Sequence, residues 1–254
     1  MKQPSYKGFE AMQIAICQFN PVIGAISQNV ERILAFARRA HTEKAELIIF
    51  PELALCGYPP KDLVFSPDFA NACEAGLSRL AEQTPVPVLI GAPSRERYNS
   101  AYFCTVGFFA LVAKKRLLPN YQVFDEQRYF VAGSTEDQNI LELGAKRLGV
   151  SICEDAWSEV VGYEQNPIQD LVQKHQVDIL VNLTASPFEL GKSAEREAMF
   201  CELAKRYRKP FLIAGQVGAN DGLIFDGGSL VIDPRGQVLW RAKSFEEELW
   251  VIAG

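Results

Sequence analysis

The chain has 254 residues, of which 48% are hydrophobic and 22% are charged, a composition typical of a globular protein with a large core. Its net charge of -5 and pI near 5.3 argue against a nucleic-acid-binding surface, because phosphate binding requires clustered Lys and Arg. Small molecules are therefore the expected partners. The apolar runs are too short to span a bilayer and the first twelve residues lack an apolar signal core, so we expect no membrane association and a cytoplasmic location.

Strands and helices are predicted to alternate in the first third of the chain. Residues 12–21 form a short apolar run typical of a strand, and residues 27–46 repeat apolar side chains at helical spacing. A second strand is expected over 46–52, followed by a turn rich in Gly and Pro and by a helix over 69–83. This alternation indicates an α/β or α+β protein.

The remaining chain continues with strands, some of which follow one another directly. Two consecutive strands are predicted within 85–94 and 101–117, and a hairpin is predicted within 223–242, around a turn at Asp233 to Gly236. Further buried strands, separated by helical segments, are expected over 147–155, 177–185 and 209–218. We see no linker or repeat, so we expect a single layered domain over 12–254, preceded by a polar leader over 1–11 that is a candidate for disorder.

The scarcity of histidine excludes several common active sites. The only two histidines, His41 and His175, lie in polar helix ends, which disfavours catalysis by Ser-His-Asp or Cys-His and a His-rich metal site. The six cysteines have no zinc spacing and no export signal precedes them, so they are expected to be reduced thiols. The glycines form neither a dinucleotide-binding fingerprint nor a P-loop, so we expect no metal or nucleotide cofactor in this chain.

Three reactive or charged residues stand at the ends of apolar runs, where α/β proteins commonly place ligand sites. Glu52 ends LIIFPE, Lys115 ends FFALVAKK and Cys153 ends GVSIC. Each alone is more simply explained as a strand cap, a solvated lysine or a core thiol. Together they supply what an attacking thiol needs, because Glu52 can act as the base that the missing histidine would provide. Glu154 and Asp155 would raise the pKa of the thiol, and a nearby Lys115 would offset them.

Three longer segments carry a family resemblance. FPELALCGYPPKDL, KKRLLPNYQVFDEQRYF and GVSICEDAW resemble the carbon-nitrogen hydrolase, or nitrilase, superfamily, and the resemblance runs from about Met12 to the end of the chain. The GYPP, LPNY and CED elements are most similar to the glutaminase domains of glutamine-dependent NAD synthetases. The resemblance implies a four-layer α-β-β-α sandwich and an amide-hydrolysing enzyme.

The resemblance also implies roles for individual residues. Glu52, Lys115 and Cys153 match the catalytic triad of the family, and Glu126 in FDEQRYF matches its second active-site glutamate. One departure is Leu117, which stands where many relatives have His, and which should alter packing more than chemistry. Residues expected to contact the substrate are Tyr121, Phe124 and Glu154 as pocket walls, with Ser186 and Lys192 as partners of the substrate's α-amino and α-carboxylate groups.

The implied substrate is L-glutamine, cleaved to glutamate and ammonia through a thioester on the cysteine. In the synthetases the ammonia serves NAD synthesis from nicotinic acid adenine dinucleotide, in a second domain that uses ATP and Mg²⁺ and that this chain lacks. That synthetase domain is the expected covalent or functional partner, and the family implies a homo-oligomer. Two alternatives are a stand-alone amidase resembling ω-amidases, which would prefer α-keto-acid amides, and a non-catalytic scaffold, whose cysteine would resist a diazo analogue of glutamine.

Overall fold

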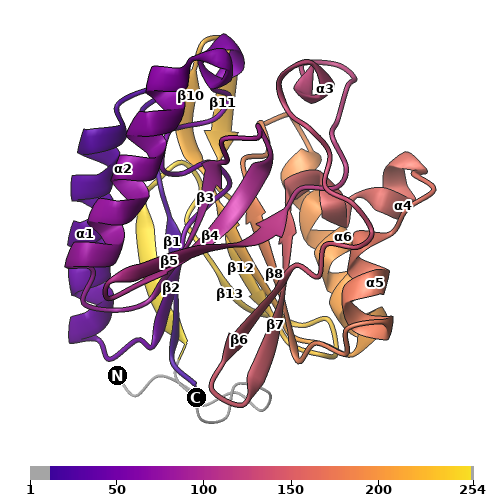
Figure 1. The fold of residues 1–254 in the computed structure, drawn as a ribbon. Coiled ribbons are helices and arrows are strands. Elements are labelled where there is room, and N and C mark those ends of the chain that lie inside the picture. Colours follow the sequence, from indigo (N-terminus) through magenta and orange to yellow (C-terminus); the bar gives the residue numbers. More distant parts are fainter. Residues whose placement is uncertain (1–11, 253–254) are drawn as a thin grey trace.

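Two six-stranded sheets face each other in the computed structural model, which describes residues 12–252 (Figure 1). The first sheet has the strand order β14-β1-β2-β3-β4-β5, in which β1, β2 and β3 are parallel and the outer strands are antiparallel. Its strands are β1 (Ile14–Gln18), β2 (Leu47–Ile49), β3 (Val88–Pro93), β4 (Asn99–Thr105), β5 (Phe108–Lys114) and β14 (Glu248–Ile252).

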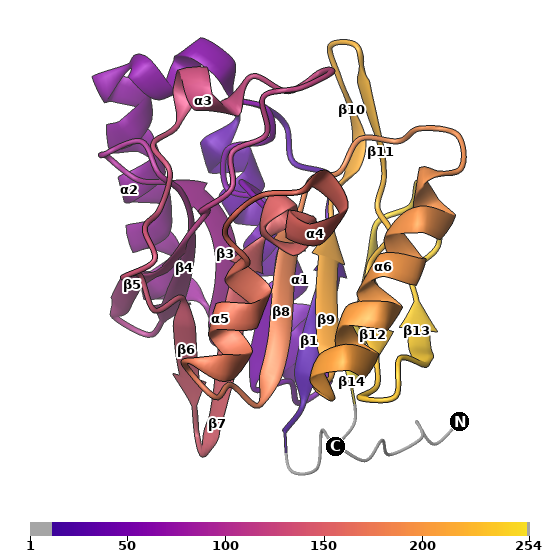
Figure 2. The ribbon, with the colours of Figure 1, turned by 90° about the vertical axis from the view of Figure 1, so that its right-hand side faces the viewer.

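The second sheet repeats this plan, with three parallel strands between antiparallel neighbours. Its order is β13-β12-β9-β8-β7-β6, and β7, β8 and β9 are the parallel strands. Its strands are β6 (Ile140–Leu143), β7 (Lys146–Ile152), β8 (Ile179–Thr184), β9 (Phe211–Gly215), β12 (Leu230–Ile232) and β13 (Val238–Arg241). A separate hairpin of β10 (Val217–Asn220) and β11 (Leu223–Asp226) extends beyond the strand ends (Figure 2).

Helices cover the outer face of each sheet. Figures 1 and 2 show α1 (Ile26–Thr42) and α2 (Pro67–Gln83) on the first sheet, and α5 (Pro167–Gln173) and α6 (Lys192–Tyr207) on the second. On α1 the buried residues recur at helical spacing, which explains why this segment forms a helix with one face against the sheet. Short helical turns complete the structure: η1 (Lys61–Phe65), α3 (Glu126–Tyr129), η2 (Cys153–Ala156) and α4 (Ser158–Val161).

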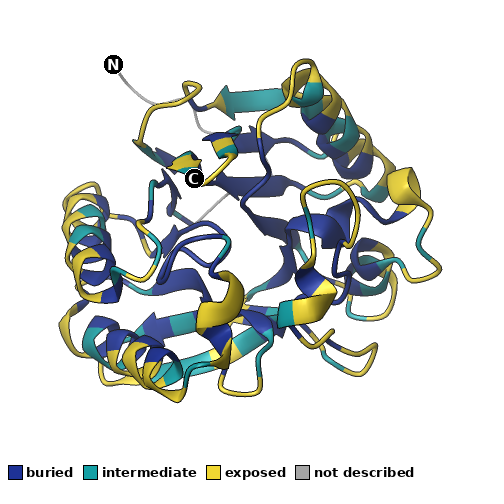
Figure 3. Cartoon of the chain, turned by 90° about the horizontal axis from the view of Figure 1, so that it is seen from above, coloured by how far each residue is buried: buried dark blue, intermediate teal, exposed yellow. Residues whose placement is uncertain are grey.

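The core between the sheets is built from apolar side chains of both. Ile16 and Ile49 of the first sheet belong to the same buried cluster as Val150 and Val181 of the second. Each such side chain contributes roughly 1.5–3 kcal/mol when fully buried. Figure 3 shows the buried strands at the centre and exposed residues on the outer sides of the helices. The predicted four-layer α-β-β-α sandwich in a single domain is therefore confirmed.

Most expected elements are present, and the structure adds a few. The turn from Asp233 to Gly236 joins β12 to β13 as predicted, whereas the hairpin of β10 and β11 and the edge strand β14 were not anticipated. No helix within residues 12–252 combines the length and the apolar character needed to cross a membrane. The leader predicted over 1–11 lies outside the described residues.

Candidate active site

Glu52, Lys115 and Cys153 come together where the two sheets meet. Glu52 follows β2, Lys115 directly follows β5, and Cys153 directly follows β7, so two of these residues come from the first sheet and one from the second. The Lys115 Nζ lies 2.7 Å from Glu52 Oε1, and both side chains are fully buried. Cys153 is 5% exposed, which leaves its thiol within reach of the solvent-facing pocket described below.

A close approach of two backbones holds Glu52 in place. A Cβ atom on Gly91 of β3 would lie 2.2 Å from the Leu53 nitrogen, so only glycine allows this contact. Gly91 also donates its N–H to the Pro51 carbonyl, and its own carbonyl accepts the N–H of Leu55. Leu53 itself has a positive φ of 47°, a backbone conformation that is uncommon for a branched side chain. The turn that carries Glu52 is therefore fixed by β3.

The Glu52 carboxylate is hydrogen-bonded from both sheets. Its Oε1 accepts from Lys115 Nζ and from Asn99 Nδ2, each at 2.7 Å, and its Oε2 accepts the backbone N–H of Ala185 at 2.9 Å. Asn99 begins β4 of the first sheet, while Ala185 follows β8 of the second. Three donors from separate elements leave this carboxylate little rotational freedom.

Cys153 is the first residue of η2, at the sharp turn where β7 ends. Its φ of 43° lies in the left-handed region, where non-glycine residues are rare and often functional. The Thr184 hydroxyl donates to the Cys153 Sγ at 3.2 Å. Burial and the charge of Glu52 raise the pKa of the thiol well above its ordinary value, although Lys115 and Thr184 act in the opposite direction. The resting sulfur is thus a neutral thiol that needs a base.

The acidic neighbours of Cys153 act differently from one another. Glu154 raises the pKa of the thiol, as the sequence indicated, but burial and Glu52 are larger causes. Asp155 turns its carboxylate toward backbone N–H groups on both sides of the active centre. Asp155 is not among the main causes of the raised pKa of the thiol, and its carboxylate accepts three backbone N–H groups.

Glu126 forms the far side of the buried cluster. Its Oε1 accepts from Lys115 Nζ at 2.7 Å and from the Tyr58 hydroxyl at 2.8 Å, while its buried Oε2 has no hydrogen-bond partner among the residues that the structure describes. Burial raises the pKa of Glu126 to about 7, despite the nearby Lys115. Burial also opposes the charge on Lys115, but Glu126 and Glu52 together more than compensate and hold the pKa of the lysine well above its ordinary value. Lys115 is therefore a buried, permanently charged ammonium.

A pocket of about 250 Å³ opens over the Cys153 thiol. Glu154 lies in its wall, and its Oε1 accepts from the hydroxyls of Tyr121 and Tyr163 at 2.8 Å and 3.0 Å. The residues that line this pocket are Tyr121, Gln122, Phe124, Cys153, Glu154, Trp157, Val160, Val161, Ser186, Glu189, Lys192 and Glu195. All five residues expected from the sequence to contact the substrate are among them.

Charged groups of both signs line this pocket. The Lys192 Nζ lies 3.8 Å from Glu189 Oε1 and 5.9 Å from the ring centres of Phe124 and Trp157, with its side chain 17% exposed. Glu154, Glu189 and Glu195 supply carboxylates. The pocket can thus receive a molecule that carries both an anionic and a cationic group.

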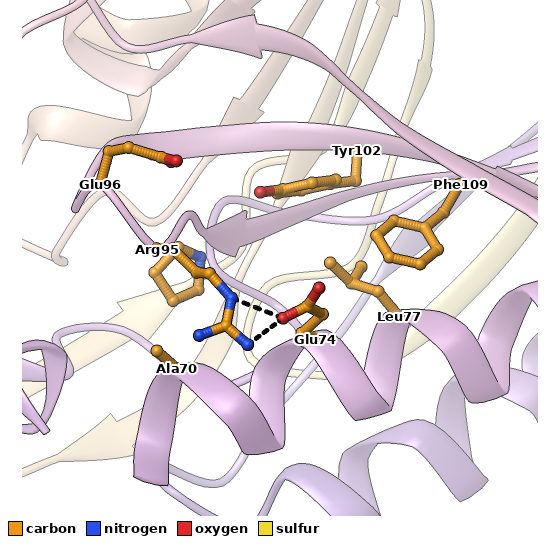
Figure 4. A pocket seen from close by; sticks show the side chains of 8 residues that line it. Ala70, Glu74, Leu77, Arg95, Glu96, Tyr102 and Phe109 are labelled. Carbon is orange, nitrogen blue, oxygen red and sulfur yellow. Dashed lines mark hydrogen bonds and ion pairs between the residues drawn. The ribbon is translucent and has the colours of Figure 1, made fainter. Parts of the chain in front are cut away.

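A second depression lies away from this centre, between α2 and strands β3 to β5 (Figure 4). Its volume is about 160 Å³. Arg95 and Glu74 form an ion pair at its rim, and Tyr102, Leu77 and Phe109 form its apolar wall. None of its lining residues is a thiol or a buried base, so it lacks the groups needed to cleave an amide.

Several residues of the centre were not anticipated from the sequence. Tyr58, Asn99 and Thr184 each hydrogen-bond a residue of the catalytic cluster. Tyr58 lies within FPELALCGYPPKDL, a segment that carried the family resemblance and could have drawn attention to it. Asn99 begins an ordinary strand and gave no signal, because its importance depends on the pairing of β4 with β3.

The fold and this site define a class of enzymes. Paired sheets that bring Glu, Lys and Cys to one buried point are the arrangement expected of a carbon-nitrogen hydrolase. The family model described as carbon-nitrogen hydrolase matches residues 13–253, and the chain belongs to this family.

Among individual proteins, the chain is similar to the glutamine-dependent NAD(+) synthetases. It is 39% identical to that of Synechocystis sp. over 94% of its own length and 46% of the relative's. It is also similar to the structure of glutamine-dependent NAD+ synthetase from Acinetobacter baumannii in complex with ADP, with a TM-score of 0.86, 35% identity and coverage of 94% and 45%. An amidase from Nesterenkonia sp. AN1 shares the fold, with a TM-score of 0.82, 23% identity and coverage of 95% and 92%. The chain thus spans about half the length of the synthetases it matches.

Proposed function

We propose that this chain is a glutaminase, which hydrolyses the side-chain amide of L-glutamine to glutamate and ammonia through a thioester on Cys153. The observation that carries the proposal is the buried cluster of Glu52, Lys115 and Cys153 at the base of a pocket with charged groups of both signs. The similarity to glutamine-dependent synthetases supports glutamine as the substrate.

In the first half of the reaction, Glu52 takes the proton of Cys153 as the sulfur attacks the amide carbon. The raised pKa of the thiol makes this base necessary, since little thiolate exists beforehand. Lys115 Nζ and the backbone N–H that follows Cys153 stabilise the oxyanion, and such donors are each worth about 3 kcal/mol. Protonated Glu52 then transfers its proton to the departing nitrogen, and ammonia leaves.

In the second half, water hydrolyses the thioester. Glu52 is again the base, and Glu126 assists because its buried Oε2, which accepts no hydrogen bond from residues 12–252, can accept one from water. The tetrahedral intermediate collapses with departure of the Cys153 sulfur, which regains its proton from Glu52. Glutamate is released, and no metal or cofactor takes part in either half of this proposal.

The charges of the pocket favour glutamine over the amide of an α-keto acid. Lys192 is the partner that we assign to the α-carboxylate, while Ser186 and the carboxylate of Glu154 are assigned to the α-ammonium group. An α-keto acid lacks that ammonium group and would leave the acidic side of the pocket unmatched. This difference makes the ω-amidase alternative the weaker candidate.

The proposed partner is a synthetase domain that consumes the ammonia. The similar synthetases are about twice as long as the matched segment, and their name couples glutamine use to NAD synthesis. We propose that such a domain uses ATP and Mg²⁺ to convert nicotinic acid adenine dinucleotide to NAD. We also propose that the protein works in the cytoplasm and forms a homo-oligomer. Light scattering of the purified protein tests the oligomer.

The activity is tested by incubating the protein with glutamine and measuring ammonia and glutamate in equal amounts. Cys153→Ala should abolish both products, while Cys201→Ala, which alters a partly exposed thiol on α6, should leave the rate unchanged. Glu52→Gln should also be inactive. A Cys153→Ala protein that keeps the wild-type rate would refute the proposal, and faster turnover of the α-keto-acid amide would favour the alternative.

A further inference from the structure

One carboxylate joins the two backbone segments that carry the lysine and the cysteine. Asp155 is fully buried, and its Oδ1 accepts the N–H groups of Arg116 at 3.0 Å and Leu117 at 2.9 Å. Its Oδ2 accepts the N–H of Ile152 at 3.0 Å. Both carboxylate oxygens are therefore engaged by backbone donors from two different segments.

These donors stand immediately beside the catalytic positions. Arg116 and Leu117 follow Lys115 as the chain leaves β5 of the first sheet, and Ile152 precedes Cys153 at the end of β7 of the second. Positions 116 and 117 lie beyond Lys114, the last paired residue of β5, and the Asp155 carboxylate satisfies their N–H groups. A shift of this carboxylate would therefore move the lysine and the cysteine relative to each other.

We propose that Asp155 is a positioning residue, which sets the distance between the Lys115 ammonium and the Cys153 thiol by binding the backbone beside each. This inference rests on the proposed function, because it assumes that Lys115 and Cys153 act on the same carbonyl. Asp155 does not line the substrate pocket, so its effect reaches the substrate only through those two residues. Misplacement of reacting groups by about 1 Å costs on the order of a hundredfold in rate.

The arrangement requires a carboxylate rather than an amide. Three N–H groups point at two oxygens, and an asparagine could offer only one acceptor oxygen. Whichever way the amide is turned, its NH₂ group faces a backbone N–H, and two donors repel each other. Asp155→Asn therefore keeps the shape of the side chain and breaks its hydrogen bonds on one side, either to Ile152 or to Arg116 and Leu117.

The test compares Asp155→Asn with a control at a second buried aspartate. Asp233 accepts the N–H groups of Arg235 and Gln237 in the turn between β12 and β13, and it lines neither the pocket nor the catalytic cluster. Steady-state kinetics with glutamine, the rate of Cys153 alkylation by iodoacetamide, and the melting temperature are measured for both variants. We expect kcat of Asp155→Asn to fall by about 10 to 100-fold with KM within about twofold. Asp233→Asn should lower the melting temperature and leave kcat within about twofold.

The outcomes separate this inference from the proposed function. If wild type hydrolyses glutamine and folded Asp155→Asn keeps its kcat, the positioning role is refuted and the glutaminase proposal stands. If wild type does not hydrolyse glutamine, the alkylation rate still decides the positioning role, because it reports the surroundings of the thiol without any amide substrate. If Asp155→Asn is alkylated at the wild-type rate, the positioning role is then overturned.

A second variant covers the case in which Asp155→Asn fails to fold. Asp155→Ala leaves a space that formate can enter, and the formate carboxylate can accept the same N–H groups. Recovery of kcat in formate, but not in chloride at equal ionic strength, supports the positioning role. Folded Asp155→Ala with wild-type kcat in chloride overturns it.

Discussion

The catalytic cluster and the substrate pocket above it are built in opposite ways. In the cluster, Glu52 and Lys115 are fully buried and directly paired, and donors from both sheets hold the Glu52 carboxylate. In the pocket, charged side chains from loops and from the start of α6 are partly exposed, and Lys192 lies 3.8 Å from its acidic neighbour. The difference indicates that rigid, buried geometry sets the reaction type, whereas substrate choice depends on the buried Glu154 together with groups such as Lys192, which solvent partly screens.

The largest expected effect comes from removing the charge at the centre of the cluster. Lys115→Met leaves the carboxylates of Glu52 and Glu126 buried without their shared cation, so kcat should fall by about 10⁴-fold and unfolding free energy by about 3–5 kcal/mol. Steady-state kinetics with glutamine measure kcat, and urea denaturation measures the free energy of unfolding. The matched control is Lys114→Met, which removes a partly exposed ion pair with Asp137 and should leave kcat unchanged. Equal kinetics for the two variants would contradict the assignment of Lys115.

The second largest effect should follow the ionisation of Glu126. Burial raises the pKa of Glu126 to about 7, so the folded state favours the neutral carboxyl. The stability that this preference contributes is fully present below the ordinary pKa of 4.5 and is lost as pH rises through about 7. Activity should change in the opposite direction, rising through about pH 7 as the carboxylate forms. Glu126→Gln should lower kcat by about 10²-fold and flatten both profiles.

Melting temperature and kcat, each measured against pH, test this opposition. The Glu126 carboxylate pairs with Lys115, so the Gln variant should also lose part of its stability above about pH 7, where that carboxylate is ionised in the wild type. A Glu126→Gln enzyme that keeps the wild-type pH dependence of kcat would assign the ionisation to another group.

A smaller effect is expected from a residue that never touches the substrate. Gly91→Ala places a Cβ against the backbone of the turn that carries Glu52, so kcat should fall by about tenfold to a hundredfold through displacement of the base. Gly222→Ala is the control, because a Cβ at Gly222 meets no atom within 4 Å and its φ is not in the left-handed region. Steady-state kinetics with unchanged circular dichroism provide the measurement. Similar kcat values for Gly91→Ala and Gly222→Ala would show that displacement of the turn does not impair catalysis.

The smallest expected effect lies in the pocket. Lys192→Met should raise KM for glutamine by about tenfold, because a partly screened pairing with the α-carboxylate is lost, and should change kcat by less than about threefold. Lys192→Arg should restore most of the affinity, since it keeps the charge. A large fall in kcat with unchanged KM would show that Lys192 acts in the reaction and not in substrate binding. That result would contradict the contrast between the two regions.

The sequence predicted the three central residues of the cluster better than the groups that hold them in place, for a physical reason. Glu52, Lys115 and Cys153 each follow a strongly apolar strand, so their positions could be inferred from strand ends and from motifs. Asn99 and Ala185 contribute through strand pairing and a backbone N–H, which a linear pattern of side chains does not reveal. The layered fold was predictable from alternating strands and helices, whereas the β10 and β11 hairpin was not, because its strands are short and half exposed.

The hydrogen bond from the Ala185 N–H to Glu52 has a consequence for folding. Neither sheet contains a complete active centre, since the base depends on a donor from the opposite sheet and the thiol belongs to that sheet as well. Enzymatic activity should therefore return, in refolding from urea, only when the two halves have docked, after far-ultraviolet circular dichroism has recovered. Activity is then a built-in reporter of sheet docking, and its recovery in step with the circular dichroism signal would show that the sheets form and dock together.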